Sequence, residues 1–203
     1  MDGVRRWLAV GPLTVQPALI LVPLLLAIVA SREGRHWRTA ILIPLVLVAL
    51  QPDTATMLAI TAGIAAMTAA ASQLSPRGWT VRRTLTPIGA LGLAVTGLLL
   101  AGIQSPPPVA FVEGTIRIAV LSGSVAMILH FLAIALMAAA LLSRSGPTGF
   151  ALAAYFTVAA LAAAFWAFPM PIAGAGPSHL LGFGLAVGWL ATDSRSDAAC
   201  QPH

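Results

Sequence analysis

The residues best suited to chemistry are two carboxylates, because the 203-residue chain has only six acidic residues in all. Asp53 follows Gln51-Pro52 between two apolar runs, and Glu113 lies in a proline-rich stretch between two later runs. Two carboxylates beside one groove can act as acid and base or hold a divalent cation. Glu113 and Asp53 are therefore the candidate catalytic residues. The other acidic residues lie in the tails or in an arginine-rich segment: Asp2, Glu33, Asp193 and Asp197.

Both carboxylates also have a structural interpretation. Pro52 cannot donate a backbone hydrogen bond, so it ends the first apolar run, and Asp53 or Thr54 can cap the helix that follows. Glu113 can pair with Arg117, four residues later, at the start of another helix. The sequence leaves both interpretations open beside the catalytic one.

The composition indicates a membrane protein with several spans. Hydrophobic residues make up 59% of the chain and charged residues only 8%, with a mean hydropathy of +0.93, whereas about a quarter of a soluble domain is charged. Apolar runs of about twenty residues favour helices over the alternating pattern of an outer-membrane barrel. All eleven basic residues are arginines, which fits cytoplasmic loops better than nucleic-acid binding. The single cysteine, Cys200, excludes an internal disulfide or a cysteine metal cluster.

We predict an all-α membrane bundle of about seven transmembrane helices, forming one domain over the whole chain. The expected spans are 9–30, 39–51, 54–73, 85–103, 117–142, 149–168 and 178–192. By the positive-inside rule the C-terminus is cytoplasmic and the N-terminus lies outside. Arg5 and Arg6 resemble the start of a signal peptide, but the run after them continues to about Ala30, which favours a retained helix. The arginines that mark the cytoplasmic face include Arg32, Arg77, Arg144 and Arg195.

Three irregular segments fall on the outer face in this topology: 51–57, 104–115 and 168–178. Non-helical backbone near membrane depth is tolerated only where protein or water covers it, so the sequence predicts an outward-facing groove. Gln16-Pro17 predicts a proline kink near the outer end of the first span, with a ligand-binding amide as the alternative. His130, inside the fifth span, is expected to be a core histidine with a hydrogen-bond partner.

Three of these motifs occur in the order found in a known family. They are Gln16-Pro17, then Gln51-Pro52-Asp53-x-x-Thr56, then Pro171-x-x-x-x-Gly176-x-Ser178. This arrangement resembles the SEDS family (FtsW/RodA-type membrane proteins of shape, elongation, division and sporulation). The corresponding family motifs read Gln-Pro-Ser-Glu, Gln-Pro-Asp-Leu-Gly-Thr-Ala and Pro-Phe-Ile-Ser-Tyr-Gly-Gly-Ser, and the second is the most specific.

The resemblance covers about residues 12–192 and implies a shortened, divergent member. The family has ten spans with both termini inside, and the seven expected here look like its last seven. Ala18-Leu19 replaces the Ser-Glu of the first motif, and Ala175 and Pro177 replace a tyrosine and a glycine of the third. The family's large outer loop is reduced to 104–115, where Glu113 is the only carboxylate.

The function implied by the resemblance concerns the bacterial cell wall. Family members polymerise peptidoglycan from lipid II at the outer face of the cytoplasmic membrane, together with a class B penicillin-binding protein. Glu113 would then be the base, and Asp53 would order the groove or a bound divalent cation. The residues expected to bind the undecaprenyl-linked precursor are Gln16, Gln51, Thr56, Arg117, Gly176 and Ser178.

Two other classes of protein stay open from the sequence. The first is a non-catalytic membrane subunit or scaffold, in which alanine-rich helices pack against a larger membrane partner. The second is a small-solute transporter, which broken helices at mid-membrane would favour. The expected partners are membrane lipids and a lipid-linked precursor or membrane protein, and nucleic acid is not among them.

Overall fold

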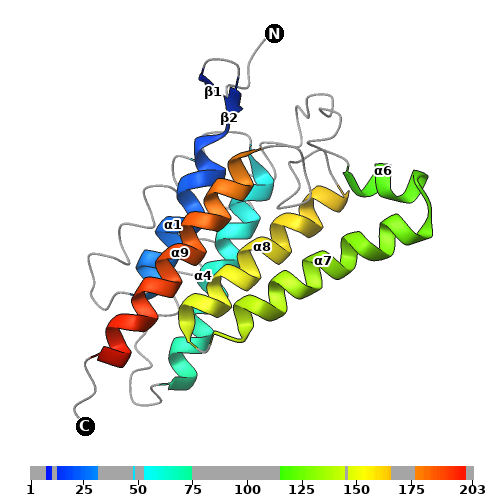
Figure 1. Ribbon diagram of the computed structural model, residues 1–203. Coiled ribbons are helices and arrows are strands. Elements are labelled where there is room, and N and C mark those ends of the chain that lie inside the picture. Colours follow the sequence, from blue (N-terminus) through cyan, green and yellow to red (C-terminus); the bar gives the residue numbers. More distant parts are fainter. Residues whose placement is uncertain are drawn as a thin grey trace.

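The computed structural model describes residues 8–10, 13–31, 48, 53–74, 115–144, 146–165 and 177–199, and these form a bundle of helices with one small hairpin (Figure 1). The hairpin strands β1 (Leu8–Val10) and β2 (Leu13–Val15) are antiparallel, with Leu8 opposite Val15. The helices are α1 (Pro17–Ser31), α4 (Thr54–Leu74), α6 (Thr115–Leu121), α7 (Ser124–Leu142), α8 (Pro147–Phe165) and α9 (Pro177–Ala199). The prediction of a helical bundle is confirmed.

Helix α8 is the centre of the bundle. It contacts α1, α4 and α7, and its contact with α4 is the most extensive between any two described elements. Helix α9 packs mainly along α1. Helices α1, α4 and α9 all begin at the end of the bundle near the hairpin, whereas α8 runs the opposite way and ends there (Figure 1). The starts of three helices are therefore gathered at one end.

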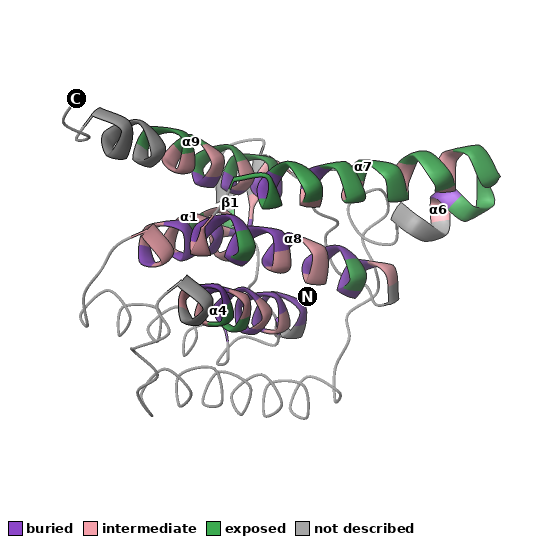
Figure 2. Cartoon of the chain, turned by 90° about the horizontal axis from the view of Figure 1, so that it is seen from below, coloured by how far each residue is buried: buried purple, intermediate pink, exposed green. Residues whose placement is uncertain are grey.

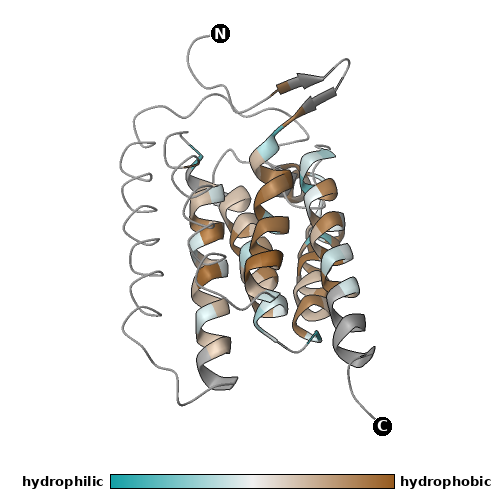
Figure 3. Cartoon of the chain, turned by 90° about the vertical axis from the view of Figure 1, so that its left-hand side faces the viewer, coloured by the Kyte–Doolittle hydropathy of each residue, from teal (hydrophilic) through white to brown (hydrophobic). Residues whose placement is uncertain are grey.

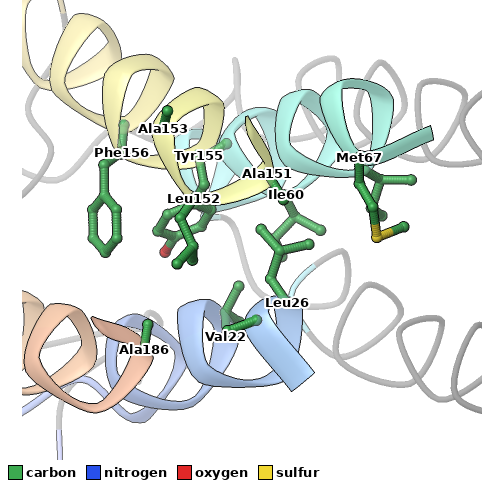
Figure 4. Packing of buried hydrophobic residues seen from close by; sticks show 14 of the residues in the cluster. Val22, Leu26, Ile60, Met67, Ala151, Leu152, Ala153, Tyr155, Phe156 and Ala186 are labelled. Carbon is green, nitrogen blue, oxygen red and sulfur yellow. The ribbon is translucent and has the colours of Figure 1, made fainter. Parts of the chain in front are cut away.

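The core is apolar and closely packed. Tyr155 and Phe156 of α8 are fully buried, and Phe156 makes edge-to-face ring contacts with Tyr155 at 5.0 Å and with Phe183 of α9 at 5.2 Å. Figure 4 shows Tyr155 and Phe156 pointing from α8 toward α1 and α9, while Val22 and Leu26 of α1 point back toward α8 and α4. Figure 3 shows α1, the helix after the hairpin, to be hydrophobic along most of its length. Burial of such surface is the main stabilising contribution to the bundle.

Two glycines allow helices to approach closely. A Cβ atom added at Gly182 of α9 would collide with the backbone oxygen of Leu19 in α1. One added at Gly63 of α4 would lie 3.0 Å from the backbone oxygen of Ala151 in α8. Small residues at helix contacts let the backbones come together in this way. These two positions set the spacing of the α1–α9 and α4–α8 pairs.

Helix α7 is apolar but mostly uncovered. By length and composition two of the described helices can cross a membrane, at Ser124–Leu142 and Pro147–Ala164. In the second, 61% of residues are buried within the protein, but in the first only 6% are. Figure 2 shows α7 as a largely exposed ribbon beside α8, which is mostly buried or half-buried. Its exposed side chains include Val125, Ile128, Leu129, Phe131, Leu132 and Leu136.

Two of the expected spans differ from the structure. The first does not begin near residue 9, because the hairpin occupies the chain up to Val15 and α1 starts at Pro17. The fifth is not one helix, because Gly123 has φ +111° and separates α6 from α7. That backbone conformation is nearly exclusive to glycine and cannot continue a helix.

The remaining spans fall into two groups. The ranges 54–73, 149–168 and 178–192 correspond to α4, α8 and α9, and α9 continues further, to Ala199. The ranges 39–51 and 85–103 lie outside the described residues, apart from Val48, which is helical and buried. Only two described helices meet the membrane-span criterion, so the figure of seven spans remains a prediction.

Candidate functional site

A buried polar cluster joins the starts of α1, α4 and α9. We define it as Gln16, Asp53, Thr56 and Ser178. Gln16 directly precedes α1, Asp53 directly precedes α4, and Ser178 is the second residue of α9. The relative exposure of Gln16 and Ser178 is 1% and that of Asp53 is 2%, so the cluster belongs to the interior. The structure therefore brings together residues from all three motifs of the sequence.

Asp53 caps helix α4. Its Oδ1 accepts a hydrogen bond from the Thr56 backbone N–H at 3.2 Å, and its Oδ2 accepts one from the Thr56 hydroxyl at 2.8 Å. The first intrahelical bond follows from the Met57 N–H to the Asp53 backbone oxygen at 3.1 Å. An aspartate before a helix satisfies an amide that has no intrahelical partner. The capping interpretation of Asp53 is confirmed.

Gln16 connects the other two helices to this cap. Its side-chain Nε2 donates to Asp53 Oδ2 at 2.6 Å, and its backbone N–H donates to the Ser178 hydroxyl oxygen at 2.8 Å. Its backbone oxygen accepts from the Leu19 N–H in the first turn of α1. Pro17 is the first residue of that helix. Proline fits this position because a backbone N–H there would have no acceptor within the helix. The expected proline kink is therefore wrong at this position, and Gln16 is instead a bridge between helix starts.

The Asp53 carboxylate accepts several hydrogen bonds from protein groups. It receives hydrogen bonds from the Gln16 side chain, the Thr56 hydroxyl and the Thr56 backbone. A buried carboxylate is tolerated when donors surround it in this way, and its charge also lies at the positive end of the α4 dipole. With these donors in place, Asp53 positions the helix starts. To act as a base or to bind a cation, Asp53 would first have to give up one of these hydrogen bonds.

Two buried oxygen atoms, one in the cluster and one in α8, lack a partner within the described part of the chain. Among the described residues, neither Gln16 Oε1 nor the Tyr155 hydroxyl has a hydrogen-bond partner. Tyr155 belongs to the neighbouring helix α8. His179, also buried, follows Ser178 in α9. Sequence reasoning gave no role to Tyr155. One feature of the sequence could have pointed to Tyr155: it is the single tyrosine of the chain and lies inside an apolar run.

The other predicted site residues are not placed in this cluster. Gln51, Glu113 and Gly176 lie outside the described residues, so the proposed base and the Glu113–Arg117 pair stay predictions. Arg117 lies in α6, and the structure describes only its backbone. Within the described ranges, no group of three His, Cys, Asp or Glu side chains could hold a metal ion.

His130 differs from its expected environment. It lies in α7, the helix whose apolar side chains are mostly exposed. The expectation was a histidine inside the bundle with a hydrogen-bond partner, but within the described part of the chain its buried Nε2 atom has none. His130 is half-buried, so the groups that cover its Nε2 atom within the described ranges are not hydrogen-bonding ones.

Comparison with known proteins adds no relative. No protein-family model, no curated protein and no solved structure matches the chain.

Proposed function

We propose that the chain is a multi-pass protein of a bacterial cytoplasmic membrane that binds an undecaprenyl-linked peptidoglycan precursor, or helps to polymerise it, in cell division or cell-shape maintenance. It would be a shortened, SEDS-like protein with about seven spans and a cytoplasmic C-terminus. The observation that carries the proposal is the polar cluster, because residues of the three family-like motifs hydrogen-bond to one another.

The exposed face of α7 supports the membrane part of the proposal. Water would surround a row of large apolar side chains if this helix were in a soluble protein, which is unfavourable. In a bilayer the same side chains contact lipid, and the helix backbone satisfies its own hydrogen bonds. The directions of the helices agree with this reading, since α1, α4 and α9 start at one end and α8 ends there (Figure 1).

The polar cluster supports the binding part of the proposal because of where it lies in the bundle. It fixes residues 53 and 177–178, the points where two proline-containing segments, 51–52 and 168–177, join helices α4 and α9. In the proposed topology this end of the bundle is the outer one. A fixed framework at the base of a groove keeps ligand-binding groups in place. Asp53 would order the groove, and Glu113 would supply the base if the protein is a glycosyltransferase.

The first experiment measures binding and polymerisation with the purified full-length protein in lipid nanodiscs. Lipid II is the probe, undecaprenyl phosphate tests the lipid tail with its phosphate, and phosphatidylglycerol tests general anionic-lipid binding. We expect saturable binding of lipid II. If the protein is active, glycan polymer should form and disappear in Glu113→Gln with lipid II binding retained. Ser122→Ala changes an exposed serine between α6 and α7; it is the control and should behave as the native protein.

The contrary result is equally clear. Folded protein that binds lipid II no better than phosphatidylglycerol would contradict the proposal. The exposed α7 face would then favour the second candidate, a scaffold that packs against a larger membrane protein such as a class B penicillin-binding protein. Co-purification of one such partner, lost when Leu129 and Leu132 are both changed to alanine, would support that candidate.

A further inference from the structure

Helix α9 has an exposed apolar face on the side turned away from α1. We call it the α9 glycine face, and its members are Leu180, Leu181, Gly184, Leu185 and Gly188. All five residues are exposed, and residues spaced three, four or seven apart share one side of a helix. Gly182, which packs against α1, lies on the opposite side of α9. The face therefore belongs to the outside of the bundle.

The middle of the α9 glycine face carries no side chain. A Cβ atom added at Gly184 or Gly188 would meet nothing within 4 Å, whereas one added at Gly182 would collide with the α1 backbone. Packing within one chain therefore explains Gly182 but neither of the other two glycines. Apart from proline, glycine is the least favourable residue in a helix interior. Two glycines on the exposed side of one helix therefore indicate a contact outside the bundle.

The order of residues along the face is typical of a close helix contact in a membrane. Gly184 and Gly188 are four residues apart, leucines flank them, and the segment 180–192 contains no charged residue. Gly-x-x-x-Gly in an apolar helix lets a second helix approach until the two backbones touch. Inside the bundle, Gly182 already allows such an approach between α9 and α1. On the α9 glycine face, the approaching helix would come from another molecule.

A second copy of the same helix fits this face. The leucines project beside the glycines, so two identical faces are complementary when a twofold axis relates them. In one membrane both copies of α9 run in the same direction, which sets each glycine opposite the same glycine of the second copy. Because the face has no charged residue, the two copies meet without like-charge repulsion. One helix pair with this motif is sufficient to form a dimer in a bilayer.

We propose that two copies of the chain associate in the membrane through the α9 glycine face. Gly184 and Gly188 lie against the same residues of the second copy, and the leucines of each copy pack beside the glycines of the other. The exposed side chains of α7 are not part of this contact. The proposal requires a bilayer around the bundle but no ligand, so a failure of lipid II binding would leave it unaffected.

Energy transfer between copies measures the association. Full-length protein is labelled at Cys200, the single cysteine, with either a donor or an acceptor dye, and the two batches are reconstituted together into liposomes. We expect energy transfer that saturates as the protein density rises. Gly188→Leu should raise the dissociation constant at least about tenfold, because the new side chain holds the helices apart. Ala135→Leu, which enlarges an exposed residue of α7, is the matched control and should leave the association unchanged.

Two results of this experiment would overturn the proposal. One is energy transfer no greater than random proximity gives at the same density, and the other is equal association of Gly188→Leu and the native protein. Unfolding in excess detergent, which separates the copies, checks the fold of each variant. Gly188→Leu should keep the native unfolding midpoint there, because its Cβ meets no other atom of the chain within 4 Å.

Cysteine cross-linking tests the same face without enlarging a glycine. In a Cys200→Ser background, Ala191→Cys places a thiol on the same side of α9, seven residues after Gly184. Oxidation should join two copies several-fold faster through this thiol than through Leu132→Cys, which is also exposed but lies on α7. Equal rates, or a faster reaction through α7, would assign the association to another surface and overturn the proposal.

Discussion

The side chain of Gln16 donates a 2.6 Å hydrogen bond to Asp53 across 37 residues of sequence, and both groups are buried. This bond links the start of α1 to the cap of α4, and the Gln16 backbone extends the link to Ser178 at the start of α9. Each helix start thereby satisfies a polar group of another. The relationship makes the cluster a single unit, so changing one member should affect the stability of the whole end of the bundle.

Removing the Asp53 carboxylate should be strongly destabilising. Asp53→Ala leaves the Gln16 amide and the Thr56 N–H buried without an acceptor, and we expect a loss of about 3 kcal/mol, since bonds to a charged group are each worth roughly 1.5–3 kcal/mol. Asp53→Asn keeps one oxygen for the cap and should lose less. Unfolding in detergent, followed by circular dichroism, measures both. Equal stability of Asp53→Ala and the native protein would show that the cluster does not support the fold.

Ser178 should contribute through one backbone contact. Ser178→Ala removes the acceptor of the Gln16 N–H, and the expected loss is about 1 kcal/mol. Ser122→Ala is the matched control, because that hydroxyl is exposed and donates to the Ile118 backbone oxygen of its own helix. Its effect should stay within about 0.5 kcal/mol. Equal losses of stability in the two variants would contradict the role given to the buried Ser178 hydroxyl.

The close contact of α1 and α9 should be sensitive to one methyl group. Gly182→Ala places a Cβ against the Leu19 backbone oxygen, which cannot move away easily, and should destabilise the protein by roughly 1–3 kcal/mol. Gly184→Ala lies in the same helix, but its added Cβ would meet nothing within 4 Å. That control should be neutral or stabilising by up to about 1 kcal/mol, because alanine favours a helix. Unfolding midpoints of the two variants decide the matter, and the reverse order would mean that α9 packs differently.

The break between α6 and α7 should depend on Gly123. The values φ +111° and ψ 168° lie in a region almost restricted to glycine. We therefore expect Gly123→Ala to destabilise the protein by about 1–3 kcal/mol. No neighbouring atom would obstruct the new Cβ, so the effect is one of backbone conformation alone. A denaturation series that includes Gly184→Ala as the helical comparison would detect it. An unchanged stability would indicate a continuous helix over the predicted span 117–142.

The α7 surface should be accessible to lipid. In a Cys200→Ser background, cysteine at Leu132 should react with a membrane-soluble thiol reagent in liposomes, because that side chain is exposed. Cysteine at Leu152, which is fully buried in α8, should react far more slowly. Labelling rates give the comparison. Fast reaction of Leu132→Cys with a water-soluble reagent alone would argue against a bilayer around α7.

Local features of this protein followed from the sequence. The cap at Asp53 depends on residues three apart, so proline, aspartate and threonine in that order are sufficient to predict it. The helical character of α4, α8 and α9 follows from long apolar runs without interruption. The break at Gly123 was missed, because a glycine inside an apolar run is also compatible with a continuous helix.

The tertiary structure alone decided which polar groups meet. Gln16, Asp53 and Ser178 are far apart in the chain, and their hydrogen bonds form because the packed bundle brings the starts of α1, α4 and α9 together. Pro17 illustrates the difference: proline fits either a kink or the first position of a helix, and the hairpin before Gln16 places it at the first position. The uncovered face of α7 is likewise a property of the assembled bundle. The apolar sequence of a helix predicts that its side chains avoid water. Only the packing of the bundle determines whether other helices cover those side chains.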